Sequence, residues 1–262
     1  MKKVFCFVFV AFFLVYTDTY PARADETSTT QIQSSVDEIA CGVTADDLAA
    51  IKNIQNDASL SYSAELQQEL VARRNLLKKT IDCAEADAMQ DQENLDNTPV
   101  DQSFQELENQ LSDRLSDAIS YYDLQSQKVD DVGISGTESI ARDVLDWREN
   151  NYAPLSENIL NFITWSDNQV LFTKAVGRLA QVDNLVNSPL FSENSDLQND
   201  YEQAAVSLKA AQDQNNQAKI ALSQSLPPDQ SLLLIKQSLG SLSAAYQHFF
   251  DISGLVQSLL PH

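Results

Sequence analysis

The chain has 262 residues, 43% of them hydrophobic, which is enough apolar material for one large domain or two small ones. Its formal net charge is −21, and such a charge repels nucleic acid and anionic membranes, so neither is expected as the main partner. The sequence has 6 glycines and 7 prolines, which predicts few tight turns and a small number of long elements.

The first 24 residues have the pattern of a secretory signal peptide. Lys2 and Lys3 precede an apolar run over residues 4–16, and the small residues of Ala-Arg-Ala at 22–24 suit a signal peptidase. We therefore expect cleavage after Ala24 and a secreted or periplasmic product with no integral membrane segment. An uncleaved anchor is the alternative, although the run is shorter than the roughly 20 residues of a transmembrane helix. Residues 25–33 are polar and aperiodic, which predicts a flexible leader.

Two cysteines follow the signal peptide, Cys41 and Cys83. An even pair in an oxidising compartment predicts a disulfide. That disulfide would close a loop of about 40 residues and stabilise the fold by roughly 4 kcal/mol in the chain-entropy model. The sequence has no C-x-x-C and no histidine near either cysteine, so a redox or metal role is not indicated.

Hydrophobic residues recur every three or four positions through the remaining chain, which predicts helices. Two short helices are expected first, one over residues 35–41 and one that begins after Thr44. Long helices, each about 45 Å at 1.5 Å per residue, are then expected over 63–90, 103–132, 155–187, 195–226 and 229–260.

The predicted fold is all-α: an elongated antiparallel bundle of about five long helices plus two short N-terminal helices. We expect one domain over residues 34–262, with a subdivision near 91–102 as the alternative, because residues 91–101 carry Pro99 and several Asn and Asp residues typical of a linker. Pro154 interrupts a periodic stretch, which predicts a kink or break near residues 151–153. Some apolar stripes would suit a coiled-coil seam, within the chain or with a second copy.

Few residues suit catalysis. The sequence has two histidines, His248 and His262, and we interpret His248 as a packing or interface residue with no carboxylate at helical spacing beside it. The motifs of metal, nucleotide and hydrolase sites are not recognised, so we predict no enzyme, no cofactor and no metal site.

A basic cluster and an apolar loop are two candidates for binding. The basic cluster comprises Arg73, Arg74, Lys78 and Lys79. It would either pair with acidic neighbouring helices or dock an anionic surface or polymer. In the loop after Pro189, Leu190 and Phe191 would either cap the end of the bundle or form an exposed tip that inserts into a partner.

The third candidate is an aromatic set around Pro154. Trp147, Tyr152, Trp165 and Phe172 have the spacing of a helical core, but an interrupted helix could also open a pocket between them.

These features favour a non-catalytic interaction or scaffold protein of a bacterial cell envelope or exterior. Its expected partner is a protein, either a second copy or an envelope component, and the oligomeric state stays open. The first alternative is a carrier of a small apolar ligand held near Pro154. A weaker alternative is a hydrolase whose carboxylates converge in three dimensions.

Overall fold

The computed structural model describes residues 43–224 and 226–259, and within these ranges the regular structure is helical with no strand. The predicted all-α class is thereby confirmed. The chain forms two compact units, which we call unit 1 (Met1–Asp87 and Ser120–Arg148) and unit 2 (Ala88–Ile119 and Glu149–His262). A single cut near residues 91–102 does not describe this division, because each unit combines two separate segments.

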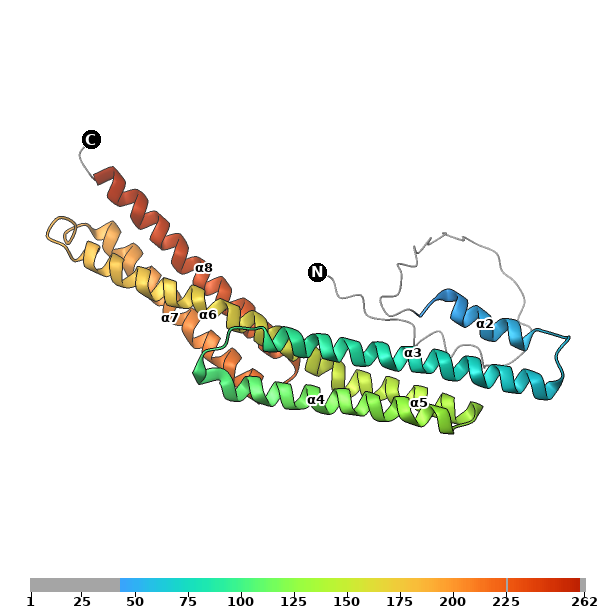
Figure 1. Ribbon diagram of the computed structural model, residues 1–262. Helices are drawn as coiled ribbons and strands as arrows, with labels where there is room; N and C mark the ends of the chain where they lie inside the picture. Colours follow the sequence, from blue (N-terminus) through green and yellow to red (C-terminus); the bar gives the residue numbers. More distant parts are fainter. Residues whose placement is uncertain (1–42, 225, 260–262) are drawn as a thin grey trace, which may run out of the picture. The chain divides into compact units, whose positions relative to one another are not determined.

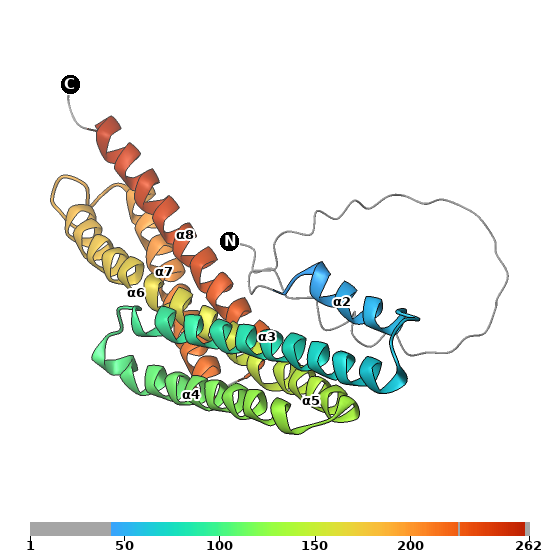
Figure 2. The ribbon, with the colours of Figure 1, turned by 45° about the vertical axis from the view of Figure 1, so that its right-hand side comes forward.

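Unit 1 contains α2, the first part of α3, the last part of α4, a 3-10 turn and α5, and its long helices lie side by side (Figures 1 and 2). The bounds are α2 Ala45–Gln55, α3 Tyr62–Asp96, α4 Gln105–Lys128, η2 Val129–Asp131 and α5 Ile134–Trp147.

Helix α2 begins at a capping box. The Thr44 hydroxyl accepts from the backbone N–H of Asp47, whose carboxylate accepts from the N–H of Thr44 at 2.8 Å. Val43 and Ile51 are buried against Leu76 of α3. The predicted second short helix is therefore confirmed. The predictions over residues 1–42 (the signal peptide, the leader, the helix over 35–41 and Cys41) lie outside the described residues.

Helix α3 is longer than expected, because it continues to Asp96 through half of the predicted linker. The apolar stripe extends with it, since Ala88 and Leu95 are both fully buried. The Asn and Asp residues of this segment lie largely on the solvated side, where they tolerate helix. The helix ends before Pro99, whose ring disfavours helical geometry in the preceding residue.

Unit 2 contains the end of α3, the 3-10 turn η1 (Gln102–Phe104), the start of α4, and the helices α6 (Ala153–Val186), α7 (Ser195–Ser223) and α8 (Pro228–Leu259). The last three lie side by side (Figures 1 and 2). Their shared buried core comprises Phe172, Ala175, Val182, Val186, Phe191, Leu197, Ala204, Leu208, Ala211, Leu242, Ala245, Phe249 and Ile252.

The interruption expected near Pro154 takes the form of a π-helical turn, Arg148–Tyr152, between α5 and α6. Pro154 then lies in the first turn of α6, a position at which proline is common. The chain therefore passes the proline without an intervening loop. Over the described ranges, none of these helices combines the length and hydropathy needed to cross a membrane.

Candidate functional sites

The lysines of the predicted basic cluster are paired within unit 1. Lys78 Nζ lies 2.5 Å from a carboxylate oxygen of Asp130, and Lys79 Nζ lies 2.7 Å from one of Asp47. The hydrogen bond from Lys79, followed by the N–H of Thr44, lowers the pKa of the Asp47 carboxyl. These lysines therefore connect α3 to α2 and to the turn before α5.

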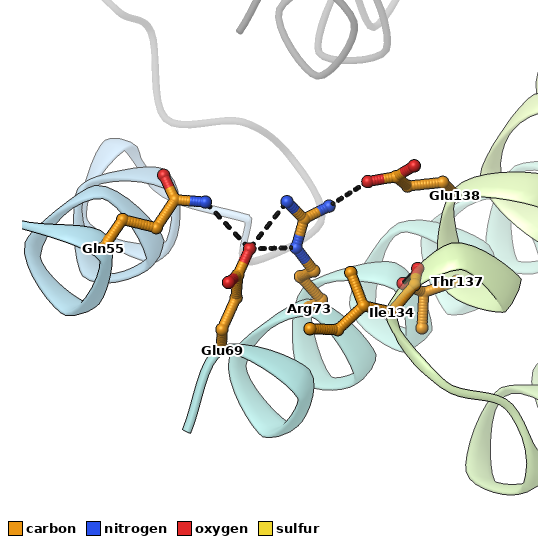
Figure 3. Close-up of polar contacts among 6 residues, drawn as sticks. All are labelled: Gln55, Glu69, Arg73, Ile134, Thr137 and Glu138. Carbon is orange, nitrogen blue, oxygen red and sulfur yellow. Dashed lines mark hydrogen bonds and ion pairs between the residues drawn. The ribbon is translucent and has the colours of Figure 1, made fainter. Parts of the chain in front are cut away.

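The two arginines of the cluster are also engaged. Arg74 donates from Nε and Nη2 to the carbonyl of Val132, at 3.1 and 2.6 Å. Arg73 is 5% exposed and donates to Glu69 of α3 at 2.7 Å and to Glu138 of α5 at 3.0 Å (Figure 3). All four cations contact acceptors of their own unit, which favours the pairing alternative over a docking patch.

The Arg73 network is completed by an amide from α2. Gln55 Nε2 donates at 2.8 Å to the same Glu69 oxygen that accepts from Arg73 (Figure 3). Three helices thus meet at one buried guanidinium. Buried ionic groups are costly to leave unpaired. The network therefore favours the packing of α3 against α2 and α5, which supply the partners of Glu69 and Arg73.

The aromatic residues expected to line one pocket are divided between the units. Trp147, in unit 1, stacks on Tyr121 with ring centroids 4.0 Å apart. Tyr152, in unit 2, is 4% exposed and donates its hydroxyl to Asp91 at 2.9 Å. Each ring is in contact with protein groups of its own unit.

Trp165 is a core residue of unit 2. It is 1% exposed, its indole N–H donates to the carbonyl of Asn215 at 3.2 Å, and the ring of Phe104 packs edge-on at 4.5 Å. These contacts favour the core interpretation for Tyr152 and Trp165 over a ligand pocket lined by Trp147, Tyr152 and Trp165.

The apolar loop after α6 contributes one residue to the core and one to the surface. Phe191 is 6% exposed and packs in the buried cluster of α6, α7 and α8, whereas Leu190 is 72% exposed. Phe191 thus caps the end of the helices. The alternative of an exposed tip formed by both residues therefore does not describe Phe191.

A pocket of about 270 Å³ lies between α4 and α7 in unit 2. Leu107, Leu111 and Leu222 give it an apolar floor, and Gln110, Asp113 and Arg114 complete its lining. The sequence does not reveal this pocket, because leucines at helical spacing form the same pattern whether they line a pocket or fill a core.

His248 has two carboxylates beside it. Its Nδ1 lies 3.3 Å from Asp200 Oδ1 of α7, and Asp251 follows three residues later on α8. One ligand atom from each residue lies within 4.8 Å of the other two. The sequence interpretation of His248 was wrong on this point, since the H-x-x-D spacing puts Asp251 on the adjacent turn.

Carboxylates also gather around Glu85 in unit 1. Partial burial, and then repulsion from Asp123 and Asp82, raises the pKa of the Glu85 carboxyl. Cys83 is buried, and because Cys41 lies outside the described residues the disulfide between them stays a prediction.

Comparison with known proteins gives no relative. No family model matches the sequence, and no curated protein or solved structure matches it either.

Proposed function

We propose that the chain is a non-catalytic interaction module of a bacterial cell envelope or exterior, exported by its N-terminal segment. Its contact surface is a face of α6 in unit 2, which we call the α6 face. The partner is a basic, amphipathic helix of another protein.

The α6 face combines exposed apolar side chains with carboxylates. Its five residues, Glu157, Leu160, Asp167, Val170 and Leu171, fall within about 140° of the helix circumference at 3.6 residues per turn. Leu160, Val170 and Leu171 are 49%, 56% and 41% exposed, and both carboxylates are exposed. An apolar stripe of this kind on an otherwise solvated helix face is typical of a surface that a partner covers, and this observation carries the proposal.

The charge of unit 2 indicates the chemistry of the partner. Unit 2 contains 19 Asp and Glu residues against 6 Lys and Arg, a formal charge of −13. Two copies of such a surface repel each other, so a second copy of this chain is disfavoured. A partner helix therefore needs apolar residues that contact Leu160 and Leu171, and a lysine or arginine that pairs with Asp167.

Site-specific photo-crosslinking in the native host tests this surface. We expect a photoreactive phenylalanine analogue in place of Leu171 to give one heterologous adduct, which Asp167→Lys abolishes by charge repulsion. The matched control is the same analogue in place of Val206, which is 65% exposed on α7, and it should give none. An adduct of twice the chain mass, or equal labelling from both positions, would contradict the proposal.

A second candidate function, carriage of a small amphipathic ligand, has support from the α4–α7 pocket. Its leucine floor suits an alkyl or aryl group, and Gln110 and Asp113 suit a polar or cationic end. In this case Leu111→Trp, which fills the pocket, should abolish thermal stabilisation by amphipathic ligands that stabilise the unsubstituted chain. A ligand screen that stabilises neither protein removes this candidate.

A further inference from the structure

We infer that Asp200, His248 and Asp251 form a binding site for a divalent transition-metal ion such as Zn²⁺. The three residues offer one imidazole nitrogen and two carboxylate oxygens, all within 4.8 Å of one another. Ligand atoms at about 2.1 Å from a tetrahedral zinc lie roughly 3.4 Å apart. The observed 3.3 Å between His248 Nδ1 and Asp200 Oδ1 already has this spacing, so a small side-chain movement of the exposed Asp251 completes the set.

The backbone around the cluster is held firmly. His248 and Asp251 lie on adjacent turns of α8, and Asp200 faces them from α7. The helices meet through small and apolar side chains that are at most 2% exposed: Leu197, Ala204, Ala245, Phe249 and Ile252. Two of the three ligands are thus fixed to one rigid helix and the third to its packed neighbour, which reduces the entropy lost on binding.

The residue types select the class of ion. An imidazole with two carboxylates suits zinc, cobalt, nickel or manganese better than magnesium or calcium, which prefer oxygen ligands alone. A neutral His248 with two ionised aspartates balances the 2+ charge of the ion. The side chains of His248 and Asp200 are 27% and 21% exposed, so solvent can supply the remaining ligand.

The competing role for the same residues is a simple hydrogen bond or ion pair that holds α7 to α8. The two roles differ at Asp251, whose carboxylate accepts from Gln247 of its own helix at 3.1 Å. A hydrogen bond between His248 and Asp200 does not need Asp251, whereas a three-ligand metal site does.

Isothermal titration of the purified full chain with Zn²⁺ distinguishes the roles. We expect one saturable site in an H262Q background, with affinity lowered at least about 10-fold by H248Q, D200N and D251N separately. The matched control is D213N, which removes a carboxylate of α7 that Lys209 holds at 3.0 Å, and it should leave the affinity unchanged. In the same background Zn²⁺ should shift the imidazole NMR resonances of His248.

Three outcomes would overturn the site. They are a chain that does not bind Zn²⁺, an affinity that H248Q leaves intact, and a D251N variant with unaltered zinc binding. The last result would assign the residues to a helix contact alone. Far-ultraviolet circular dichroism of each variant checks that a lost affinity is not a lost fold.

Discussion

The guanidinium of Arg73 lies 2.7 Å from the carboxylate of Glu69, one turn earlier on α3, and the two side chains are 6% and 7% exposed. In a buried pair of this kind, each charge offsets the cost of removing the other from water. Removal of the cation leaves Glu69, and Glu138 opposite it, as uncompensated carboxylates in unit 1.

We therefore expect Arg73→Met to lower the free energy of unfolding of unit 1 by about 3–5 kcal/mol. Lys128→Met, at an exposed basic residue of the same unit, should change it by less than about 0.5 kcal/mol. The measurement is urea unfolding followed by tryptophan fluorescence. Equal midpoints for the two variants would show that the Arg73 network contributes nothing.

The two tryptophans allow each unit to be followed separately. Trp147 belongs to unit 1 and Trp165 to unit 2, so W165F leaves a reporter of unit 1 and W147F a reporter of unit 2. Because Trp165 is 1% exposed and Trp147 is half-buried, we expect W147F to emit at a shorter wavelength than W165F. Identical emission maxima in the folded proteins would contradict the different burial of the two rings.

Glycine substitutions at two positions should have opposite signs. A Cβ added at Gly136 would lie 2.5 Å from the Cβ of Val132, so Gly136→Ala should destabilise unit 1 by about 1–3 kcal/mol through overpacking. A Cβ at Gly240, inside α8, meets nothing within 4 Å, so Gly240→Ala should stabilise unit 2 by about 0.5–1 kcal/mol through helix propensity. Thermal unfolding of both variants tests the difference. Equal shifts in Tm would show that Val132 moves away from the added Cβ at little energetic cost.

The Glu85 carboxyl should reduce stability at neutral pH. Burial and the neighbouring Asp123 and Asp82 raise its pKa in the folded state, so the folded state disfavours the ionised carboxyl. This destabilisation is relieved as pH falls through the raised pKa, because the carboxyl becomes protonated. Glu85→Gln should therefore stabilise the protein above this pKa, by less than about 1 kcal/mol because solvent screens the charges. The gain should shrink towards acid pH.

Unfolding free energies of Glu85→Gln measured across the acid range test that sign. Glu202→Gln, at an exposed residue of α7, is the control and should show no comparable gain. A Glu85→Gln gain that grows as pH falls would contradict the repulsion.

Mass spectrometry of the exported protein tests the N-terminal predictions. The mature chain should begin at Asp25. Its Cys83 should resist alkylation until the protein is reduced. In the Cys41→Ser variant, Cys83 should be alkylated once the protein is unfolded, without any reductant. A free Cys83 thiol in the exported chain would contradict the predicted disulfide.

The sequence predicted the helices well where local chemistry ends them. Helix α6 ends at Val186 and α7 begins at Ser195, close to the expected positions, because Asn194 caps α7 and Pro189 lies between them. The predicted end of α3 is too early. Its Asn and Asp residues favour loops in isolation, but here the helix continues because Ala88 and Leu95 are buried.

The sites were predicted less well, because they depend on which helices meet. Nothing near Arg73 in the sequence identifies Glu138 as its partner, 65 residues away. The spacing of His248 and Asp251 is present in the sequence, whereas the third member, Asp200, becomes a neighbour only through the packing of α7 on α8.

Asp47 takes part both in forming α2 and in attaching it to α3. Its carboxylate closes the N-terminal cap of the helix and also accepts from Lys79. Helices of 11 residues are too short to persist alone in water, so α2 is ordered only while it is docked. Undocking and local unfolding of residues 45–55 are thus one event, and their amides should exchange with solvent deuterium together, through a single opening.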